Sequence, residues 1–223
     1  MIAAPVSPTG WRPVPPPSLS ALQKHWLLRP GALTAGLRAL GRMQLRVLDE
    51  YAAGLPRDEA PALRLPPRTP VWVREIVMSV DGVDSVAARS LTTLAASHGV
   101  WQGMRRLRTR PLADMLYHDP GILRTPFAVA RVRPAMPLHA AALRPLREGE
   151  PPAPRPDGRT AAAGVSASMP TGIPTGILVS MPGAASAWPD PLLARRSVFW
   201  RHGQPLLVEE CFLPMFWARA RRA

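Results

Sequence analysis

Residues 71–82 read VWVREIVMSVDG, and this stretch decides the fold. Successive side chains of a β-strand point to opposite faces of the sheet, so Trp72, Ile76 and Met78 are expected to share one face with Arg74. A lone guanidinium on an apolar face requires a partner or an anionic ligand, because burying an unpaired charge is costly. The stretch therefore predicts a strand and, on it, a candidate functional arginine.

The dipeptide Asp81-Gly82 ends this strand. A type I′ turn needs two residues that tolerate positive φ, so the dipeptide predicts a β-hairpin with VDSVAARSL as the return strand. Four other stretches have a strand-like pattern: residues 43–51, 127–132, 197–201 and 204–213, with a turn expected at His202-Gly203 between the last two. The apolar spacing of SLSALQKHWLL and ALTAGLRALG predicts two N-terminal helices, and the stretch LAASHGVWQGMRRLRTRPLADMLYHD reads as a crossover helix broken at Pro111.

These elements together predict an α+β fold in which helices accompany an antiparallel sheet of about six strands. We expect a proline-rich, disordered N-terminus over residues 1–17 and one folded domain made of 18–133 and 192–217. Between the two parts, 134–191 is rich in Pro, Ala, Gly, Ser and Thr and is expected to be a flexible, low-complexity insertion. Residues 218–223 are expected to be a solvated basic tail.

The composition excludes several classes of protein. The chain has 223 residues and 47% hydrophobic content, enough for one domain with a core. A single cysteine, Cys211, rules out an intramolecular disulfide framework and a cysteine-based zinc site, and the five histidines lack ligand spacing. No stretch has the roughly 18 consecutive apolar residues of a membrane span, and no secretory signal is visible. We therefore expect a cytoplasmic protein.

The formal net charge of +13 raises the question of nucleic-acid binding. Lys24 is the only lysine, and 29 prolines accompany the arginines, which indicates a compositional bias as much as a binding patch. No RNP, zinc-finger or basic-zipper pattern is present. Nucleic acid is therefore not the expected partner, although the charge can still concentrate small anions.

Several strings resemble the chorismate–pyruvate lyase family in their order and spacing. WVREI is similar to the family's Trp-Leu-Arg-Glu-Ile, and RPLADML to its Thr-Pro-Leu-Gly-Arg-Tyr-Leu. HWLLRPGALT is similar to its Asp-Trp-Leu-Leu-Leu-Glu-Asp-Ser-Met-Thr. ARRSVFWRHGQPLLVEECFLP resembles Gly-Arg-Arg-Ser, a strand, Ser-Gly-Lys-Pro and Leu-Leu-Leu-Thr-Glu-Leu-Phe-Leu-Pro. The resemblance covers about 22–132 and 193–214.

The resemblance implies an antiparallel sheet with helices covering an internal ligand cavity. It implies conversion of chorismate to 4-hydroxybenzoate and pyruvate, the first committed step toward ubiquinone, with no metal or organic cofactor. The expected partners are thus small molecules, chorismate and 4-hydroxybenzoate, and we expect a monomer.

Carried over by position, the family's active-site arginine is Arg74 and its active-site glutamate is Glu210. Strand alternation alone does not choose between Glu209 and Glu210, since each interrupts an apolar row. Backbone groups at Leu33 and Leu112 are implied to hold the substrate carboxylate. The family's Pro-Val-Ser-Thr-Leu is replaced here by TLAAS.

An arginine offers a planar, permanently charged fork for a carboxylate, and a partly desolvated glutamate can accept from a ring hydroxyl or act as acid or base. We therefore expect Arg74 to bind an acidic or ether oxygen and Glu210 to orient the 4-hydroxyl. Three alternatives remain open: a purely structural ion pair, a non-catalytic effector-binding domain of the same fold, and an arginine-rich nucleic-acid binder.

Overall fold

The computed structural model describes residues 10–117, 119–148 and 192–222. Within these residues one seven-stranded antiparallel sheet has the order β1-β2-β3-β7-β6-β4, and β5 also pairs with β6. Its strands are β1 (Met43–Gly54), β2 (Pro70–Val80), β3 (Val83–Thr93), β4 (Leu123–Arg124), β5 (Ala128–Arg131), β6 (Leu193–Arg201) and β7 (Gln204–Phe212). The expected α+β class is confirmed, and the two-residue β4 is the strand that the sequence pattern missed.

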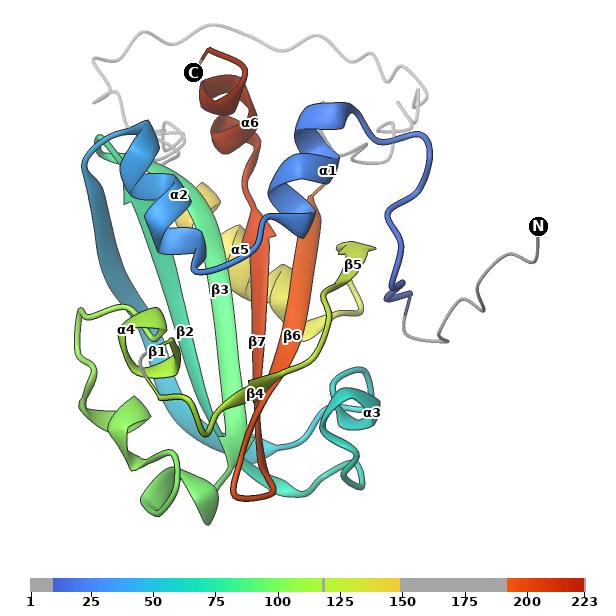
Figure 1. The fold of residues 1–223 in the computed structure, drawn as a ribbon, viewed down its shortest axis with the longest axis vertical. Helices are drawn as coiled ribbons and strands as arrows, with labels where there is room; N and C mark the ends of the chain where they lie inside the picture. Colours follow the sequence, from blue (N-terminus) through green and yellow to red (C-terminus); the bar gives the residue numbers. More distant parts are fainter. Residues whose placement is uncertain (1–9, 118, 149–191, 223) are drawn as a thin grey trace, which may run out of the picture.

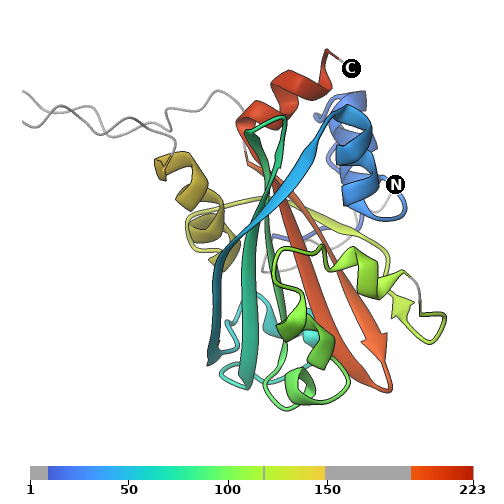
Figure 2. The same cartoon turned by 90° about the vertical axis from the view of Figure 1, so that its left-hand side faces the viewer.

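Helices lie on both faces of the sheet, as Figures 1 and 2 show. They are α1 (Ala21–Leu28), α2 (Leu33–Leu40), α3 (Ala60–Leu63), α4 (Ala113–Leu116), α5 (Pro137–Glu148) and α6 (Pro214–Ala220), with 3₁₀ turns η1 (Ala96–His98) and η2 (Gln102–Arg106). We call the face covered by α1, α2 and α4 the front face, and the face covered by α5 the back face. No helix in the described ranges is long and apolar enough to cross a membrane.

Two tight turns set the register of the long strands. Asp81 and Gly82 have φ of 49° and 80°, and His202 and Gly203 have φ of 47° and 71°. Two consecutive residues with positive φ suit a two-residue hairpin connection. The β2–β3 and β6–β7 hairpins are therefore as the sequence predicts, and the return strand β3 pairs with β7 at the centre of the sheet.

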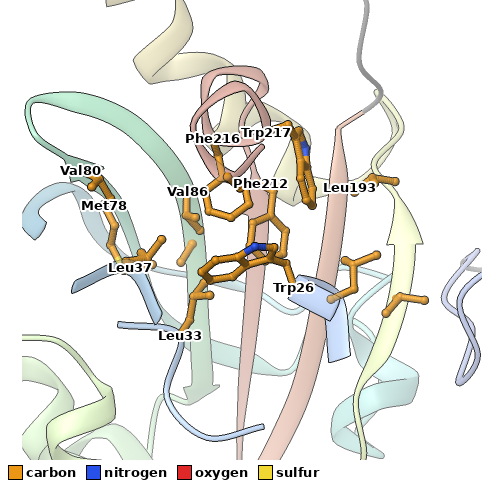
Figure 3. Close-up of a cluster of buried hydrophobic side chains, with 14 of the residues drawn as sticks. Trp26, Leu33, Leu37, Met78, Val80, Val86, Leu193, Phe212, Phe216 and Trp217 are labelled. Carbon is orange, nitrogen blue, oxygen red and sulfur yellow. The ribbon is translucent and has the colours of Figure 1, made fainter. Parts of the chain in front are cut away.

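An aromatic cluster closes one end of the front face (Figure 3). Trp26 of α1 meets Phe216 of α6 edge to face, with ring centroids 4.9 Å apart. Phe212 of β7 packs against both Phe216 and Trp217 of α6. Helices from both ends of the chain thus share one core, which holds α1 and α6 over the sheet.

The back face is covered by a helix that the sequence reading did not expect. Leu138 and Ala142 of α5 belong to a buried cluster with Val77, Ala87 and Cys211. Part of the stretch expected as a flexible insertion, 134–191, is therefore helical, because its apolar residues recur at helical spacing and find a sheet face to cover. Residues 149–191, also part of that expectation, lie outside the described residues.

The folded part also extends beyond the expected boundaries at both ends. Trp11 is 3% exposed, and Arg12 exchanges two backbone hydrogen bonds with Val129 of β5. The ordered chain therefore begins before residue 18. At the other end Arg219 pairs with Asp81 and Ala220 is buried, so this part of the expected basic tail 218–223 belongs to α6.

The segment after β3 is not the single broken helix that was expected. It consists of η1, η2 and α4, joined by turns. Arg108 has φ of 50°, and Pro111 follows it, a combination that stops a regular helix. The short turns still bury Trp101 and Met104, so the segment packs as a cover over the sheet.

Candidate active site

A small cavity lies between the front face of the sheet and its cover. Its volume is about 50 Å³. That leaves room for a few water molecules, whereas cavities that hold a benzene ring are nearer 150 Å³. Its described lining residues are Ala32, Leu33, Thr34, Leu45, Ile76, Met78, Ala88, Ser90, Pro111, Leu112, Ala113, Leu116, Tyr117, Phe127, Arg195, Ser197, Phe199, Val208 and Glu210. A ring-sized ligand therefore requires the cover to move outward.

Glu210 lies at the floor of this cavity beside a buried arginine. It stands opposite Arg195 in the β6–β7 hairpin, and Nε of Arg195 donates to Oε2 of Glu210 at 2.6 Å. The arginine side chain is 2% exposed and that of Glu210 is 15% exposed. The carboxylate is thus charge-paired, largely desolvated and still open to the cavity, a combination in which a hydrogen bond is strong.

Leu33 and Leu112 enter the cavity at the starts of two helices. Leu33 is the first residue of α2, and Ala32 before it provides no side-chain cap. Leu112 stands at the N-cap of α4, also without a side-chain cap. The first amides of a helix have no intrahelical acceptor and carry the positive end of the helix dipole. The starts of α2 and α4 therefore meet at the wall opposite Glu210's strand, and in α4 the amides of Asp114 and Met115 already donate to the carbonyls of Pro111 and Leu112.

Arg74 lies on the same face of the sheet as Glu210 but on β2, with β3 between it and β7. It pairs in register with Ser90, which lines the cavity, but Arg74 itself is not among the described lining residues. Its Nη2 donates to the carbonyl of Arg108 in the cover, and its Nε is 3.1 Å from Oε1 of Glu50. Burial lowers the pKa of Arg74, and the Glu50 carboxylate partly offsets that effect.

The contact between Arg74 and Glu50 is an ion pair without a hydrogen bond. Both Nε of Arg74 and Oε1 of Glu50 are buried, and neither has a hydrogen-bond partner in the described structure. Their separation satisfies an ion pair, so we attribute the missing bond to the direction of the N–H. A buried donor left in this state retains capacity for another acceptor.

Glu209 belongs to a separate ionic cluster on the back face. Glu209 pairs with Arg196 at 3.4 Å, and Arg89 pairs with Glu59 and Glu75, each at 2.6 Å. Burial, and then the Glu59 carboxylate, raise the pKa of Glu209 to about 8. This cluster lies on the face of the sheet opposite to the cavity, so the structure separates the two glutamates that alternation alone left equivalent.

A family model described as chorismate lyase matches residues 9–147, more than half of the chain. A protein of Bordetella pertussis named probable chorismate pyruvate-lyase is 54% identical over 213 residues, covering 95% of this chain and 92% of the relative. A Pseudomonas fluorescens protein named probable chorismate pyruvate-lyase 1 is 38% identical over 96% of this chain and 94% of its own. This chain belongs to the chorismate lyase family.

Solved structures of lower similarity were also matched. The effector domain of PhnF from Mycobacterium smegmatis is 13% identical with a TM-score of 0.45, covering 82% of this chain and 88% of that one. A GntR-family transcriptional regulator from Enterococcus faecalis is 11% identical with a TM-score of 0.39, covering 77% and 90%. Values this low carry no argument about function.

The resemblance named Leu33, Leu112 and Glu210, and the structure brings these three to one cavity, with Arg74 beside it. Sequence reasoning missed Arg195, which was part of a matching string but received no role. A signal was present: a hairpin turn at His202-Gly203 places Arg195 opposite Glu210. Tyr117 and Phe127 carried no comparable signal, because Tyr117 follows α4, Phe127 precedes β5, and both reach the cavity only through tertiary packing.

Proposed function

We propose that this chain eliminates pyruvate from chorismate to give 4-hydroxybenzoate, the first committed step of ubiquinone biosynthesis. The observation that carries the proposal is the position of Glu210: a paired, largely desolvated carboxylate facing a cavity that also receives the helix starts at Leu33 and Leu112. Membership of the chorismate lyase family supplies the substrate. We further propose a cytoplasmic monomer that requires neither metal nor organic cofactor and does not bind nucleic acid.

The reaction breaks one carbon–oxygen bond and removes one ring hydrogen. The ether oxygen of the enolpyruvyl group leaves the ring, the adjacent carbon that bears the hydroxyl loses its hydrogen, and the ring becomes aromatic. The departing group gains a hydrogen at its methylene carbon and becomes pyruvate. Because aromatisation drives the reaction, the protein has to position the substrate and stabilise charge, and a covalent intermediate is unnecessary.

In the proposed site the two ends of the substrate ring contact different groups: hydrogen-bond donors at the carboxylate end and an acceptor at the hydroxyl end. The ring carboxylate accepts from the backbone amides at Leu33 and Leu112, at the starts of α2 and α4, where an anion is favoured. The ring hydroxyl donates to Glu210, which is held in place at the opposite wall. Arg74, which lies outside the cavity lining in this structure, supplies its guanidinium to an acidic or ether oxygen once the cover moves outward.

The test is direct turnover of chorismate by the purified protein. We expect 4-hydroxybenzoate, followed by absorbance, and pyruvate, followed by a lactate dehydrogenase-coupled assay, to form in equal amounts. Glu210→Ala and Arg74→Ala are each expected to lower kcat/KM by about 100-fold or more. Circular dichroism establishes that the variants fold. Wild-type rates in both folded variants would refute the assignment of the site.

Two other outcomes would point to the alternatives. Tight binding of 4-hydroxybenzoate without turnover would indicate an effector-binding domain, since fold alone does not define function. Strong, steeply salt-dependent retention of DNA or RNA would indicate a nucleic-acid binder. Either result, with chorismate unchanged, rejects the lyase proposal.

A further inference from the structure

Arg195 is tied to more of the site than any other side chain in the described part of the cavity wall. Nε donates to Glu210, and Nη1 donates to the carbonyls of Arg29 at 2.9 Å and Trp26 at 3.3 Å. Both carbonyls belong to the C-terminal end of α1. One guanidinium therefore links the carboxylate on β7 to the helix that covers the front face.

The ring of Phe127 completes the surroundings of Arg195. The guanidinium carbon is 4.3 Å from the centroid of this ring, which also lines the cavity. Stacking on an aromatic face adds a cation–π attraction and restricts the plane of the guanidinium. With its plane set by Phe127 and one edge held by α1, Arg195 has little freedom to follow Glu210, and Glu210 has to follow Arg195.

We propose that Arg195 is a positioning residue for Glu210. It holds Oε2 by a charge-assisted hydrogen bond and leaves Oε1 as the oxygen that accepts from the substrate hydroxyl. The inference rests on the proposed function, and it assigns to Arg195 a role separate from that of Arg74. Arg195 orients the glutamate through a direct hydrogen bond, whereas Arg74 lies on β2 and pairs with Glu50.

The same strand contains a matched control for this proposal. Arg196 is the next residue of β6, is also buried, and pairs with Glu209 on the back face. It shares the strand, the residue type and the ion-pair chemistry of Arg195 but does not line the cavity. A general effect of removing a buried arginine from β6 should therefore appear in both Arg195→Gln and Arg196→Gln.

The decisive experiment is a double-mutant cycle in kcat, with Arg195→Gln, Glu210→Gln and the double variant. We expect Arg195→Gln to lower kcat roughly 10- to 100-fold with KM changed less than about threefold, because a misplaced catalytic group costs on this scale. In the Glu210→Gln background the same substitution should cost less than about twofold. Arg196→Gln should leave kcat within about threefold while lowering the melting temperature.

Arg195→Lys separates orientation from charge. Lysine keeps the charge but cannot hold Glu210 and the α1 carbonyls in one fixed plane, so kcat is expected between the wild-type and Arg195→Gln values. If Arg195→Gln fails to fold, the cycle is run with Arg195→Lys. The proposal would be overturned if the Arg195 variant had the kcat of the wild type. It would also be overturned if the Arg195 substitution lowered kcat equally in the wild-type and Glu210→Gln backgrounds.

If the proposed function is wrong, the experiments on Arg195 give a different set of results. If the wild-type protein does not turn chorismate over, Arg195 is tested by calorimetric binding of 4-hydroxybenzoate. Arg195→Gln and Glu210→Gln are then expected to weaken binding to the same extent, and the double variant no further. Additive losses would overturn the positioning role alone, and no binding by the wild type would overturn both proposals.

Discussion

Glu209 and Glu210 are consecutive in the sequence, yet their side chains lie on opposite faces of one sheet. Glu210 lines the front-face cavity with Arg195, and Glu209 is fully enclosed on the back face with Arg196. The alternation of the two strands thus places Arg195 and Glu210 on the face with the cavity and Arg196 and Glu209 on the opposite face. The Arg195–Glu210 pair is expected to affect catalysis, and the Arg196–Glu209 pair is expected to affect stability.

Glu209 is expected to make stability depend on pH. In the unfolded chain this carboxyl has a pKa near 4.5, and in the folded protein about 8. Between these values the folded state retains a proton that the unfolded state releases, so the free energy of unfolding falls as pH rises through that window. The decline is on the order of a few kcal/mol.

Urea denaturation of wild type and Glu209→Gln from pH 5 to pH 8 measures this contribution. Glutamine is neutral throughout, so the variant should lose much of the decline; Glu59, whose pKa is raised in the same direction by burial, accounts for the remaining slope. Parallel curves for the two proteins would show that Glu209 does not titrate in this range.

Arg74→Lys is expected to lower kcat/KM roughly 10- to 100-fold. Lysine preserves the positive charge but loses the planar fork that reaches both the Arg108 carbonyl and a ligand oxygen. Steady-state kinetics with chorismate provides the measurement. The comparison variant is Arg144→Ala, because Arg144 is a half-exposed arginine paired with Asp49 and should change kcat/KM by less than about twofold. Equal effects of the two substitutions would remove any special role for Arg74.

Leu33→Pro tests whether the backbone amide at the start of α2 binds the substrate. Proline suits the first position of a helix, and Ala32 before it has an extended conformation (φ −72°, ψ 130°) that proline accepts. The substitution removes one N–H, whose hydrogen bond to a charged group contributes about 1.5–3 kcal/mol, so affinity for 4-hydroxybenzoate should fall roughly 10- to 100-fold.

Leu33→Ala is the control for that experiment, since it removes the same buried side chain but keeps the amide. Calorimetric titration of both variants with 4-hydroxybenzoate isolates the contribution of the N–H. If the proline and alanine variants bind equally well, the amide at position 33 does not contact the ligand.

Phe216→Ala is expected to destabilise the fold by about 3–5 kcal/mol. Its side chain is fully buried between Trp26, Phe212 and Trp217, where it joins helices from both ends of the chain. Replacing its exposed neighbour Met215 with alanine should lower the free energy of unfolding by less than about 1 kcal/mol. Chemical denaturation compares the two variants, and similar losses would mean that α6 is not part of the core.

Particular residues show which parts of the structure could be predicted from the sequence. Asp81-Gly82 and His202-Gly203 indicated their hairpins because only residues that tolerate positive φ fit there. The back-face helix α5 was mistaken for a flexible insertion, because its alanine- and proline-rich composition resembles a linker until a sheet face is available to cover. Trp11 was likewise assigned to a disordered end, although it stacks on Arg196 at 4.3 Å.

The sequence by itself determined the long strands and the turns of the β2–β3 and β6–β7 hairpins, because backbone conformation and strand alternation are local properties. Only the tertiary structure decided which face would enclose a cavity, which glutamate would border it, and that Arg195 would join Glu210 to the end of α1. Those relationships depend on helices from distant parts of the chain packing over the sheet, and burial, the property that sets the chemistry of a charge, exists only after that packing.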